Sequence, residues 1–549
     1  MALAVLCGEY AQTTNLPAPV AFVVDHRARE GSNEEAVWVC DQLKQKIGQF
    51  SLDNGTASQC ANPLEGITAH ILTLDWPEGT NPATVPNFES KARVLRYQAL
   101  GKACRGFGIS SLLLGHHQND RYETILQRMM MGASRKLIGI DSVKEIPECD
   151  GIHGVHESGS IDSHPGLHQK SGIVAESGGV KVLRPLLRFS KDNLLATCVS
   201  RDLPWIEDPT NQDRTLTVRN AIRHMVREYR LPVALRERSI LAIAESDREL
   251  SQKVEKLFDA SKIRLDLRSG LLKVEFPRKK FNMDQTKSKD ETGFLLASLL
   301  GRMTRLVSPF RTLELGKLGE VVDAIFRGSE NYGQHTPSSG TKEGGYTAQG
   351  IYFQPLGDSG REWFLSRQNI MPMSCLQQPI PFEIKPNNYP RPIERVLTKL
   401  VLDIPACPPS TSVYDKPFHL FDNRFWIRIW NVSPLNVRIR TPTIPDFQAI
   451  RSYLSHSLRR DFDKRLQEAA PGSVRYTLPL IEIRSDNGPG RLLVLPTFQI
   501  SASIDMATLA PEQTAQFREV QWECRYRKVD LGHHNPENVL VGGYMLTGN

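Results

Sequence analysis

Short apolar runs alternate with amphipathic stretches along the first 130 residues of the chain. The apolar runs end at polar residues, as buried parallel strands commonly do; they cover residues 18–24, 70–74 and 111–114. The amphipathic stretches carry apolar side chains at helical spacing; they cover residues 32–49, 88–107 and 120–131. Ser32 and Glu35 form a capping box at the start of the first of these helices. The alternation predicts an α/β fold, an open parallel sheet with helices on both faces.

Helical spacing resumes later in the chain, over residues 190–201, 217–229 and 233–258. From about residue 265 the pattern is mixed, with a strand-like run at 270–276 and helical spacing at 292–306 and 313–326.

Residues 328–345 are rich in Gly, Ser and Thr and are typical of a linker. Beyond them, residues 418–430 and 491–500 alternate as antiparallel strands do. We therefore predict an α/β domain, a helical linker region and a mixed α+β region, at residues 1–230, 231–330 and 331–549.

Residues 143–180 interrupt the first domain with Gly, Ser and His and without periodicity. Histidines in such turns are compatible with a metal site, but the composition favours a mobile surface insertion without metal.

Composition and charge narrow the class of protein. A chain of 549 residues is too long for one hydrophobic core. No apolar run approaches the roughly 20 residues that span a bilayer, so we expect no membrane partner. The nine cysteines include no C-x-x-C pair, which argues against a zinc ribbon or a secreted disulfide framework. The net charge of +7 is compatible with a nucleic-acid partner and equally with ordinary solvated basic surfaces.

Polar clusters follow two of the predicted strands, at the edge of the sheet where ligands bind in open α/β folds. Asp25, His26 and Arg27 follow the first strand. They offer a carboxylate, an imidazole and a guanidinium to a nucleotide. The alternative is that they only cap the following helix, and the spacing favours neither reading.

The second cluster begins at Gly115 and His116 and continues into a helix. Asp120 and Glu123 are three residues apart in the first turn and share a face of that helix, whose N-terminus stabilises negative charge. Such a pair can hold a substrate ammonium, and His117 can bind phosphate or transfer a proton. First-turn capping with a packed histidine is the alternative.

A third cluster contains Asn211 and a helix on which arginines recur every three or four residues. A basic stripe of this kind can follow the phosphates of a nucleic acid, although most such stripes are solvated faces. The arginines are Arg219, Arg223, Arg227 and Arg230.

Five segments resemble, in order, the successive signatures of tRNA(Ile)-lysidine synthases: VVDHRAREGSNEEA, NFESKARVLRYQAL, LLLGHHQNDRYETILQRMMMGAS, VLRPLLRFSKDNL and LPWIEDPTNQDRTLTVRNAIRH. The resemblance covers residues 1–230, while residues past about 330 match no family that we identify. The insertions and the long C-terminal part look more like a fungal member acting in the mitochondrion than a compact bacterial one. Without a transit peptide in the given chain, the cytoplasm is the alternative location.

The resemblance implies an N-type ATP pyrophosphatase fold, similar to the adenine nucleotide alpha hydrolases. It implies that ATP with Mg²⁺ adenylates the C2 carbonyl of the wobble cytidine in the CAU anticodon of tRNA(Ile), and that L-lysine then displaces AMP to give lysidine.

The resemblance also implies roles for individual residues. The ATP site would contain Asp25, His26, Arg27, Gly115 and His116. Catalysis and lysine binding would involve His117, Asp120, Glu123, Arg93, Arg96 and Arg184. The tRNA would meet Asn211, Arg219, Asn220, Arg223 and Arg227.

Two departures from the family pattern stand out. The family's doubled acid after the histidines is here Asn119-Asp120, so one carboxylate is lost and lysine binding is expected to weaken. The family's S-G-G-x-D-S loop, whose backbone amides hold pyrophosphate, precedes a helix that begins like Met1-Ala2-Leu3-Ala4 here. We expect either a mis-set start, with the loop and a transit peptide upstream, or a catalytically silent relative that still binds tRNA.

Another reading is a tRNA thiolase of the same fold, but such enzymes need paired cysteines that this sequence does not space suitably. For residues 331–549 a clamp on the tRNA is a hypothesis that rests on their position alone. The sequence carries no signal for an oligomeric state.

Overall fold

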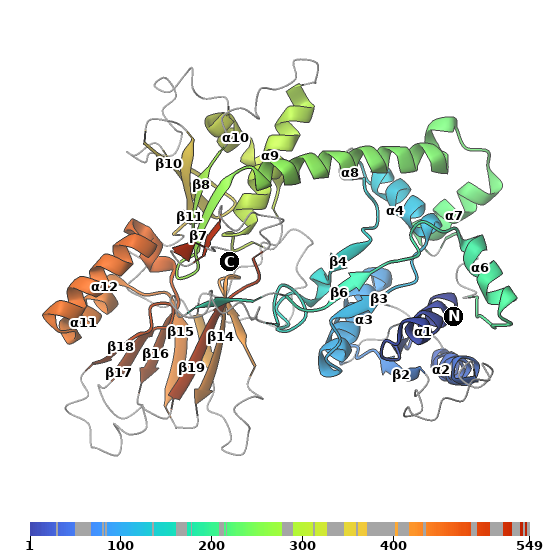
Figure 1. Ribbon diagram of the computed structural model, residues 1–549, viewed down its shortest axis with the longest axis horizontal. Helices are drawn as coiled ribbons and strands as arrows, with labels where there is room; N and C mark the ends of the chain where they lie inside the picture. Colours follow the sequence, from blue (N-terminus) through green and yellow to red (C-terminus); the bar gives the residue numbers. More distant parts are fainter. Residues whose placement is uncertain are drawn as a thin grey trace. The chain divides into compact units, whose positions relative to one another are not determined.

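The computed structural model divides the chain into two compact units (Figure 1). Unit 1 contains residues 1–156 and 178–249, and unit 2 contains residues 157–177 and 250–549. The residues that the structure describes are 1–28, 31–49, 67–78, 82, 85–133, 137–160, 173–176, 178–207, 213–215, 217–276, 289–310, 313–326, 345–357, 361–369, 401–404, 417–431, 435–484, 491–504, 520–529, 539–541 and 544–545.

Parallel strands form the centre of unit 1, as predicted. β1 (Val20–Asp25) pairs in parallel with β2 (Thr68–Thr73), and β3 (Ser111–Leu113) pairs in parallel with β6 (Lys181–Leu183). β6 also pairs antiparallel with β4 (Val143–Glu145). The three predicted strands are therefore confirmed to within two residues, and the sheet region consists of β1-β2 and β3-β6-β4.

Apart from α1, whose bounds the sequence analysis did not predict, the helices of unit 1 begin and end close to the predicted positions. They are α1 (Ala2–Thr14), α2 (Ser32–Gln49), α3 (Phe88–Gly106), α4 (Gln118–Met130), α6 (Lys191–Ser200), α7 (Val218–Glu228) and α8 (Glu237–Asp259). The predicted helix from residue 233 is a 3-10 turn, Val233–Leu235, followed by α8.

Helices cover both faces of the sheet, which confirms the predicted fold class. Alternate residues of a strand point to opposite faces. On β1, Ala21 and Val23 pack with residues of α1 and α2, whereas Phe22 and Val24 pack with residues of α3. A third core cluster, at Tyr122, Ile125, Ile222 and Ile240, joins α4 to α7 and α8. This cluster positions the site described below.

The prediction of a mobile surface insertion at 143–180 is wrong for its described residues. Ile146, Cys149 and Val155 are fully buried and belong to the core cluster of α3. Further along, β5 (Val174–Ala175) pairs in parallel with β19 (Val520–Tyr526) in unit 2. The segment lacks periodicity because tertiary partners, and not a regular element, bury its side chains. Residues 161–172 lie outside the described part of the chain.

Unit 2 is built mainly from antiparallel strands. One sheet has the order β21-β20-β7-β8-β11-β10-β9, a second has β12-β15-β16-β17-β18 and a third has β13-β14-β19-β5. Their bounds are β7 (Lys262–Asp266), β8 (Leu271–Glu275), β9 (Tyr346–Ala348), β10 (Ile351–Leu356), β11 (Glu362–Arg367), β12 (Val401–Ile404), β13 (His419–Phe421), β14 (Phe425–Asn431), β15 (Asn436–Arg440), β16 (Leu480–Arg484), β17 (Arg491–Leu495), β18 (Ile500–Ile504), β20 (Val539–Val541) and β21 (Tyr544–Met545).

Helices complete unit 2: α9 (Lys289–Arg305), α10 (Gly319–Phe326), α11 (Ile444–Tyr453) and α12 (His456–Ala469). The helix predicted at 313–326 is a 3-10 turn, Leu315–Leu318, followed by α10. The expected linker at 328–345 lies outside the described residues except for Gly345.

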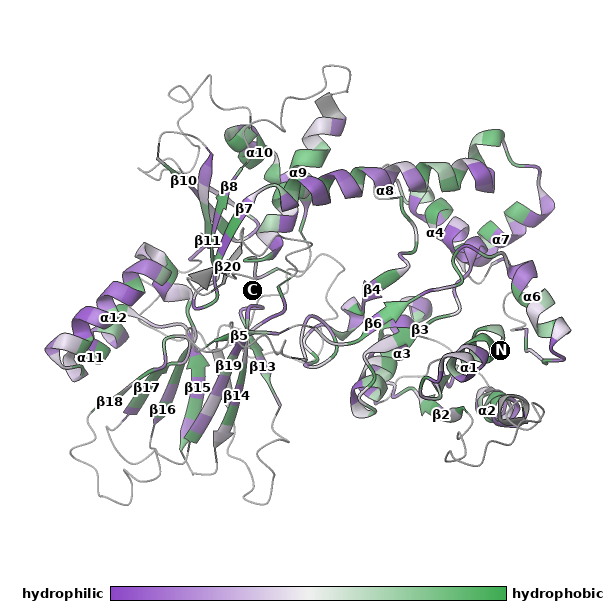
Figure 2. Cartoon of the chain, in the orientation of Figure 1, coloured by the Kyte–Doolittle hydropathy of each residue, from purple (hydrophilic) through white to green (hydrophobic). Residues whose placement is uncertain are grey.

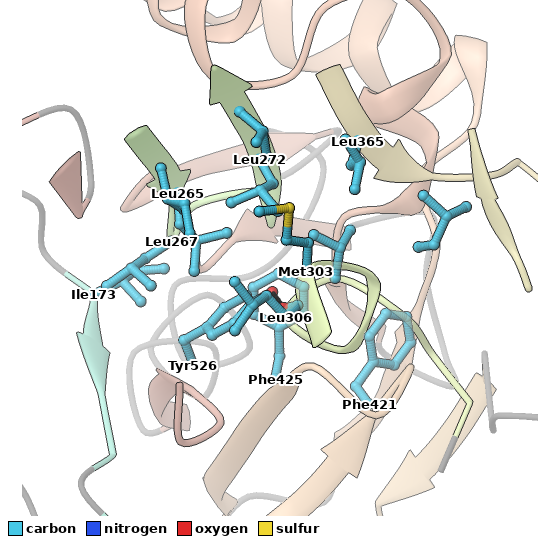
Figure 3. Packing of buried hydrophobic residues seen from close by; sticks show 14 of the residues in the cluster. Ile173, Leu265, Leu267, Leu272, Met303, Leu306, Leu365, Phe421, Phe425 and Tyr526 are labelled. Carbon is cyan, nitrogen blue, oxygen red and sulfur yellow. Dashed lines mark hydrogen bonds between the residues drawn. The ribbon is translucent and has the colours of Figure 1, made fainter. Parts of the chain in front are cut away.

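A large core cluster joins the sheets of unit 2, and a second cluster packs α11 and α12. Figure 3 shows side chains such as Leu272, Leu365, Met303 and Tyr526 directed toward one another from different elements. Figure 2 shows the corresponding pattern along the elements, with hydrophobic residues on β14 and β15 and mainly hydrophilic residues on α12.

The strand pairing bears on the predicted domain boundaries at 230 and 330. β8 pairs antiparallel with β11, so residues from both sides of position 330 share one sheet. The two compact units divide at 249 and 250, within α8. Within the described residues, no helix is long and apolar enough to cross a membrane.

Candidate functional site

The site is built around the first turn of α4. The chain leaves β3 through Gly115 and His116, and His117 is the N-cap of the helix. The backbone N–H of His117 donates to Asp120 Oδ2 at 3.0 Å, and the Asp120 N–H donates to His117 Nδ1 at 3.4 Å. This capping box fixes Asp120, and Glu123 follows one turn later on the same face. Glu123 is buried, with 7% of its surface exposed.

Two arginines of α7 bind both carboxylates. Arg219 donates through Nε to Glu123 Oε2 at 2.7 Å and through Nη2 to Asp120 Oδ1 at 3.0 Å. Arg223 donates through Nε to Glu123 Oε1 at 2.9 Å, and its Nη2 lies 3.7 Å from Asp120 Oδ1. These four residues, Asp120, Glu123, Arg219 and Arg223, form a four-charge cluster whose formal charges sum to zero.

Local sequence and packing place α7 against α4. Thr217 caps α7 by accepting from the Asn220 N–H at 3.1 Å, and Asn220 Nδ2 donates to the Asp213 carbonyl at 2.9 Å. Ile222, which is 1% exposed, packs into the core cluster of α4. Arg219 and Arg223 are four residues apart and share a face of α7. Ile222 lies beside that face, so its packing against α4 brings both arginines to the carboxylates.

The arginines that were predicted to form one basic stripe therefore fall into two pairs with different surroundings. Arg219 and Arg223 are directed to the carboxylates of α4, whereas Arg227 and Arg230 are exposed. Asn220 is buried and supports the preceding loop. Asn211 lies outside the described residues.

A partly buried group of basic side chains lies beside the four-charge cluster. Desolvation lowers the pKa of His116 to about 4; Asp120 opposes this shift, and Arg184, Arg219 and Arg96 add to it. These residues therefore lie within electrostatic reach of one another. His116 is neutral at physiological pH, and its Nδ1 has no hydrogen-bond partner among the described residues.

Arg96 and Arg184 are the other members of the basic group, since both act electrostatically on His116. Burial lowers the pKa of the Arg96 guanidinium, which remains a cation at neutral pH. Arg184 is 7% exposed and donates through Nη1 to the Asp141 carbonyl at 2.9 Å, while its Nε has no partner in the described part of the chain. Arg93 differs, since it is half-exposed and pairs with Glu148 at 2.8 Å.

The cluster after β1 has the geometry of a capped strand exit. Asp25 is buried, and its Oδ1 accepts from the Arg27 N–H at 3.0 Å and from the Ser32 hydroxyl at 2.7 Å. Arg27 has a φ of 50°. The carboxylate of Asp25 thus joins the end of β1 to the start of α2, as the alternative interpretation of the sequence describes.

Asn119, the position where the family pattern has an acid, has a clear structural contact. Its Oδ1 accepts from the Lys191 N–H at the start of α6 at 2.9 Å. An amide oxygen serves this purpose as a carboxylate would, so the substitution preserves the link between α4 and α6.

The sequence interpretation missed Trp76. Its Nε1 donates to the His26 carbonyl at 2.9 Å, and its ring stacks on Phe88 with centroids 5.6 Å apart and planes 16° apart. The only signal was its position shortly after β2, at the edge of the sheet where ligands bind. The described residues contain no group of three or more His, Cys, Asp and Glu side chains suited to a metal ion.

Comparison with known proteins agrees with this architecture. Residues 1–229 match the PP-loop domain family. A probable tRNA(Ile)-lysidine synthase of Schizosaccharomyces pombe is 24% identical over 493 residues, which cover 89% of this chain and 86% of the relative.

Bacterial relatives match a shorter segment. The tRNA(Ile)-lysidine synthase of Lactobacillus johnsonii is 32% identical over 35% of this chain and 37% of its own length. That of Bradyrhizobium sp. is 28% identical over 37% and 41%. The chain thus spans less than half the length of these bacterial relatives.

Among solved structures, a U34-tRNA thiolase from Methanococcus maripaludis aligns with 45% of this chain and 67% of its own, at 17% identity and a TM-score of 0.28. A likeness of this size carries no argument about function.

Proposed function

From the premise that residues 1–229 form a PP-loop domain, the domain of an ATP-using family, we propose that the chain is a tRNA(Ile)-lysidine synthase. Its named relatives support an enzyme of tRNA modification of the ligase type. The single observation that carries the finer proposal is the similarity to the Schizosaccharomyces pombe relative along 89% of this chain, well beyond the PP-loop domain.

The proposed reaction has two steps. In the first, the C2 oxygen of the wobble cytidine attacks the α-phosphate of ATP and pyrophosphate leaves. This converts an unreactive carbonyl oxygen into a leaving group. In the second, the neutral ε-amine of lysine attacks C2, the bond from C2 to the adenylated oxygen breaks, and AMP leaves. The nitrogen loses its proton to a base, which completes the C–N bond of lysidine.

The four-charge cluster is the proposed lysine site. Asp120 and Glu123 supply carboxylates for a substrate ammonium, and His117 holds Asp120 in place through the capping box. Arg93, Arg96 and Arg184 are proposed to face the cytidine and its developing adenylate, where fixed guanidiniums stabilise negative charge. Neutral His116 can accept a hydrogen bond or a proton there.

Other residues are proposed to bind ATP and tRNA. Asp25, His26, Arg27, Gly115 and His116 lie at or next to the carboxyl ends of β1 and β3, where nucleotides bind in open α/β sheets. Asn211 and the α7 residues, with exposed Arg227, are proposed to meet the tRNA with the CAU anticodon. Mg²⁺ is proposed to arrive with ATP as part of the substrate, and no step here depends on a resident metal.

The direct test uses the natively expressed protein with ATP, L-lysine and an isoleucine tRNA transcript that carries the CAU anticodon. We expect AMP and pyrophosphate to form and lysidine to appear at the wobble position by mass spectrometry of nuclease digests. A transcript with uridine at the wobble position is the matched control and should stay unmodified. Binding of the tRNA without AMP release or lysidine would support a catalytically silent relative.

A mitochondrial location is a separate proposal, and it rests only on the resemblance of the insertions and the long C-terminal part to a fungal member of the family. A fluorescent tag at the C-terminus of the natively expressed protein should colocalise with a mitochondrial marker. Diffuse cytoplasmic signal would contradict the proposal.

A further inference from the structure

The segment that follows β4 brings a carboxylate to α3, the helix that carries Arg93 and Arg96. The carboxylate belongs to Glu148 in the 3-10 turn η2 (Pro147–Cys149). Arg93 donates through Nε to Glu148 Oε1 at 2.8 Å. The two residues lie 55 positions apart in the chain, so the fold and not a local motif pairs them. Glu148 has no role in the reaction proposed above.

Other contacts already hold η2 against α3. Gln98 Nε2 donates to the Glu148 carbonyl at 3.0 Å, and Cys149 Sγ donates to the Tyr97 carbonyl at 3.2 Å. Cys149 is fully buried, and a Cβ at Gly101 would lie 2.7 Å from its Sγ, so the turn packs closely on the helix. An ion pair with a half-exposed partner adds little stability to such an interface. The carboxylate of Glu148 is therefore not needed to dock the turn.

Glu148 and Tyr97 together fix the guanidinium of Arg93. Glu148 accepts from its Nε, and the guanidinium lies over the Tyr97 ring, with Cζ 4.7 Å from the ring centroid. The ring is itself fixed, because Tyr97 is 2% exposed. Within the described residues, Nη1 and Nη2 of Arg93 make no hydrogen bond, and the Arg93 side chain is 49% exposed. A fixed guanidinium thus keeps its two terminal nitrogens for a ligand.

The two terminal nitrogens of a guanidinium suit a phosphate group, which offers a pair of oxygens to parallel N–H groups. The proposed function places Arg93 at the developing adenylate, where a phosphate group carries the negative charge. Donors stabilise such charge best when they are oriented before the reaction begins. An arginine side chain without a fixed contact samples many rotamers and loses that orientation. An acceptor on Nε therefore affects the reaction without touching the substrate.

Glu148 also offsets the repulsion between two arginines. Arg93 and Arg96 are three residues apart and share a face of α3, and the Arg96 Cζ lies 5.5 Å from the centroid of the same Tyr97 ring. Burial lowers the pKa of Arg96; Arg93 adds to this shift, and Glu148 opposes it. One carboxylate beside two guanidiniums lets both stay charged and close together.

We propose that Glu148 is a positioning residue for the ligase reaction, which holds Arg93 by Nε so that Nη1 and Nη2 are presented together to the phosphate group of the developing adenylate. Glu148 touches no substrate and acts only through Arg93. This inference rests on the proposed function. It gives a role to a carboxylate in a segment that the sequence predicted to be a mobile surface insertion.

A double-mutant cycle on the natively expressed protein tests whether Glu148 acts through Arg93. Glu148→Ala should lower kcat for lysidine formation about tenfold and change the KM for L-lysine by less than about twofold, because a donor loses its orientation. Arg93→Ala should lower kcat at least as much, and Glu148→Ala added to it should change kcat by less than about twofold. Multiplied effects in the double variant would show that Glu148 acts by another route. That result, or wild-type kcat for Glu148→Ala, would overturn the proposal.

The same kinetics identify which phosphate Arg93 meets. A fall in kcat with an unchanged KM for the tRNA is expected for the phosphate group of the adenylate, because that charge develops only during the reaction. A higher KM for the tRNA with unchanged kcat would place Arg93 at a backbone phosphate of the tRNA and contradict the proposal.

Two further variants separate orientation from folding. Glu148→Gln keeps an oxygen that accepts from Nε, so its kcat should lie between those of wild type and Glu148→Ala. The matched control, Glu245→Ala, removes a carboxylate that pairs with Arg248 at 2.9 Å on α8 and should leave kcat unchanged.

Thermal unfolding measures whether the carboxylate docks the turn. The Tm of Glu148→Ala should stay within about 2 °C of wild type, because other contacts hold η2. A larger fall would show that the carboxylate docks the turn and would contradict the proposal. If Glu148→Ala does not fold, the double-mutant cycle with Glu148→Gln decides, and multiplied effects there overturn the proposal.

The proposed function can fail separately. In NMR spectra of protein with 15N-labelled arginine, the Arg93 Nε–H should exchange with water more slowly in wild type than in Glu148→Ala, with or without activity. If this holds but no lysidine forms, the arrangement of Arg93 stands and the ligase activity fails. If Glu148→Ala forms lysidine at the wild-type rate, the ligase activity stands and the positioning role of Glu148 fails.

Discussion

At the residue scale, burial decides what the chemically active side chains can do. Glu123 and Asp120 each lie in ion-pair contact with arginines of α7, and His116 has a lowered pKa and lies within electrostatic reach of three arginines. Asp25 and Asn119 have the right chemistry for a ligand, yet each accepts hydrogen bonds that hold neighbouring elements together. A polar residue at the end of a strand is thus not by itself evidence for a ligand.

Glu123→Gln should destabilise the protein by about 2–3 kcal/mol, less than for fully buried pairs because its two guanidiniums are partly exposed. It should also lower kcat/KM for lysine about 100-fold. Urea unfolding and steady-state kinetics give the two values. Glu207→Gln is the control, since its pair with Lys191 is exposed, and should change stability by less than about 0.5 kcal/mol. Equal effects of the two variants would contradict the prediction.

His116 should make the protein sensitive to acid. The folded pKa of about 4 lies below the ordinary 6.5, so folding favours the neutral ring. That contribution is complete above pH 6.5 and is lost as the pH falls toward 4. Urea midpoints of wild type and His116→Asn at pH 7 and pH 4.5 measure it, and wild type should lose more stability between them. A ring titration near 6.5 by NMR would show that the prediction is wrong.

At the element scale, the core cluster of α4, α7 and α8 fixes the positions of the helices that carry the site. α7 carries arginines on a face that the sequence suggested for phosphates, but burial of Ile222 directs Arg219 and Arg223 to α4. α3 depends similarly on the segment after β4, because Cys149 and Val155 pack against it.

Gly101 on α3 lies where Cys149 and Val155 pack against the helix. A Cβ at this position would lie 2.7 Å from Cys149 Sγ and 2.7 Å from Val155 Cγ1. Gly101→Ala should therefore destabilise the protein by about 1–3 kcal/mol through overpacking. Gly106→Ala, at the end of the same helix with nothing within 4 Å, should be neutral or stabilising by up to about 1 kcal/mol. Thermal unfolding of both variants checks this, and a stable Gly101→Ala protein would contradict the described packing.

At the scale of the whole molecule, the chain crosses between the two compact units more than once. Residues 157–177 belong to unit 2 although both flanking segments belong to unit 1. They contribute β5, and Glu176 accepts from the Gly159 N–H at 2.8 Å and from Arg525 Nη1 at 3.2 Å. Unit 2 is therefore incomplete without a segment that precedes it by more than 70 residues in the sequence.

Glu176→Gln should destabilise unit 2 alone. The Glu176 side chain is fully buried, and loss of its charge leaves Arg525 with a weaker partner, at a cost of about 2 kcal/mol. Hydrogen exchange should become faster at amides of β14 and β19 but not at those of α4 in unit 1. The control is Glu275→Gln, whose side chain is 35% exposed and pairs with the 65% exposed Lys262. Faster exchange in α4 would contradict the prediction.

The sequence by itself determined the elements and the chemistry that they carry. Hydrophobic periodicity located β1, β2, β3 and the helices of unit 1 after α1 to within a few residues, because this pattern reflects which face of each element is buried. Motif spacing placed Asp120 and Glu123 together, since three residues separate them on one helix.

Only the tertiary structure decided which charges meet. Arg219 lies 96 residues from Glu123 in the chain and Arg223 lies 100, and no local pattern encodes a pairing over that distance. It follows from the packing of Ile222 against α4. The burial of residues after β4 and the contact of Asp25 with Ser32 have the same cause, because a side chain's partners depend on which surfaces the fold brings together.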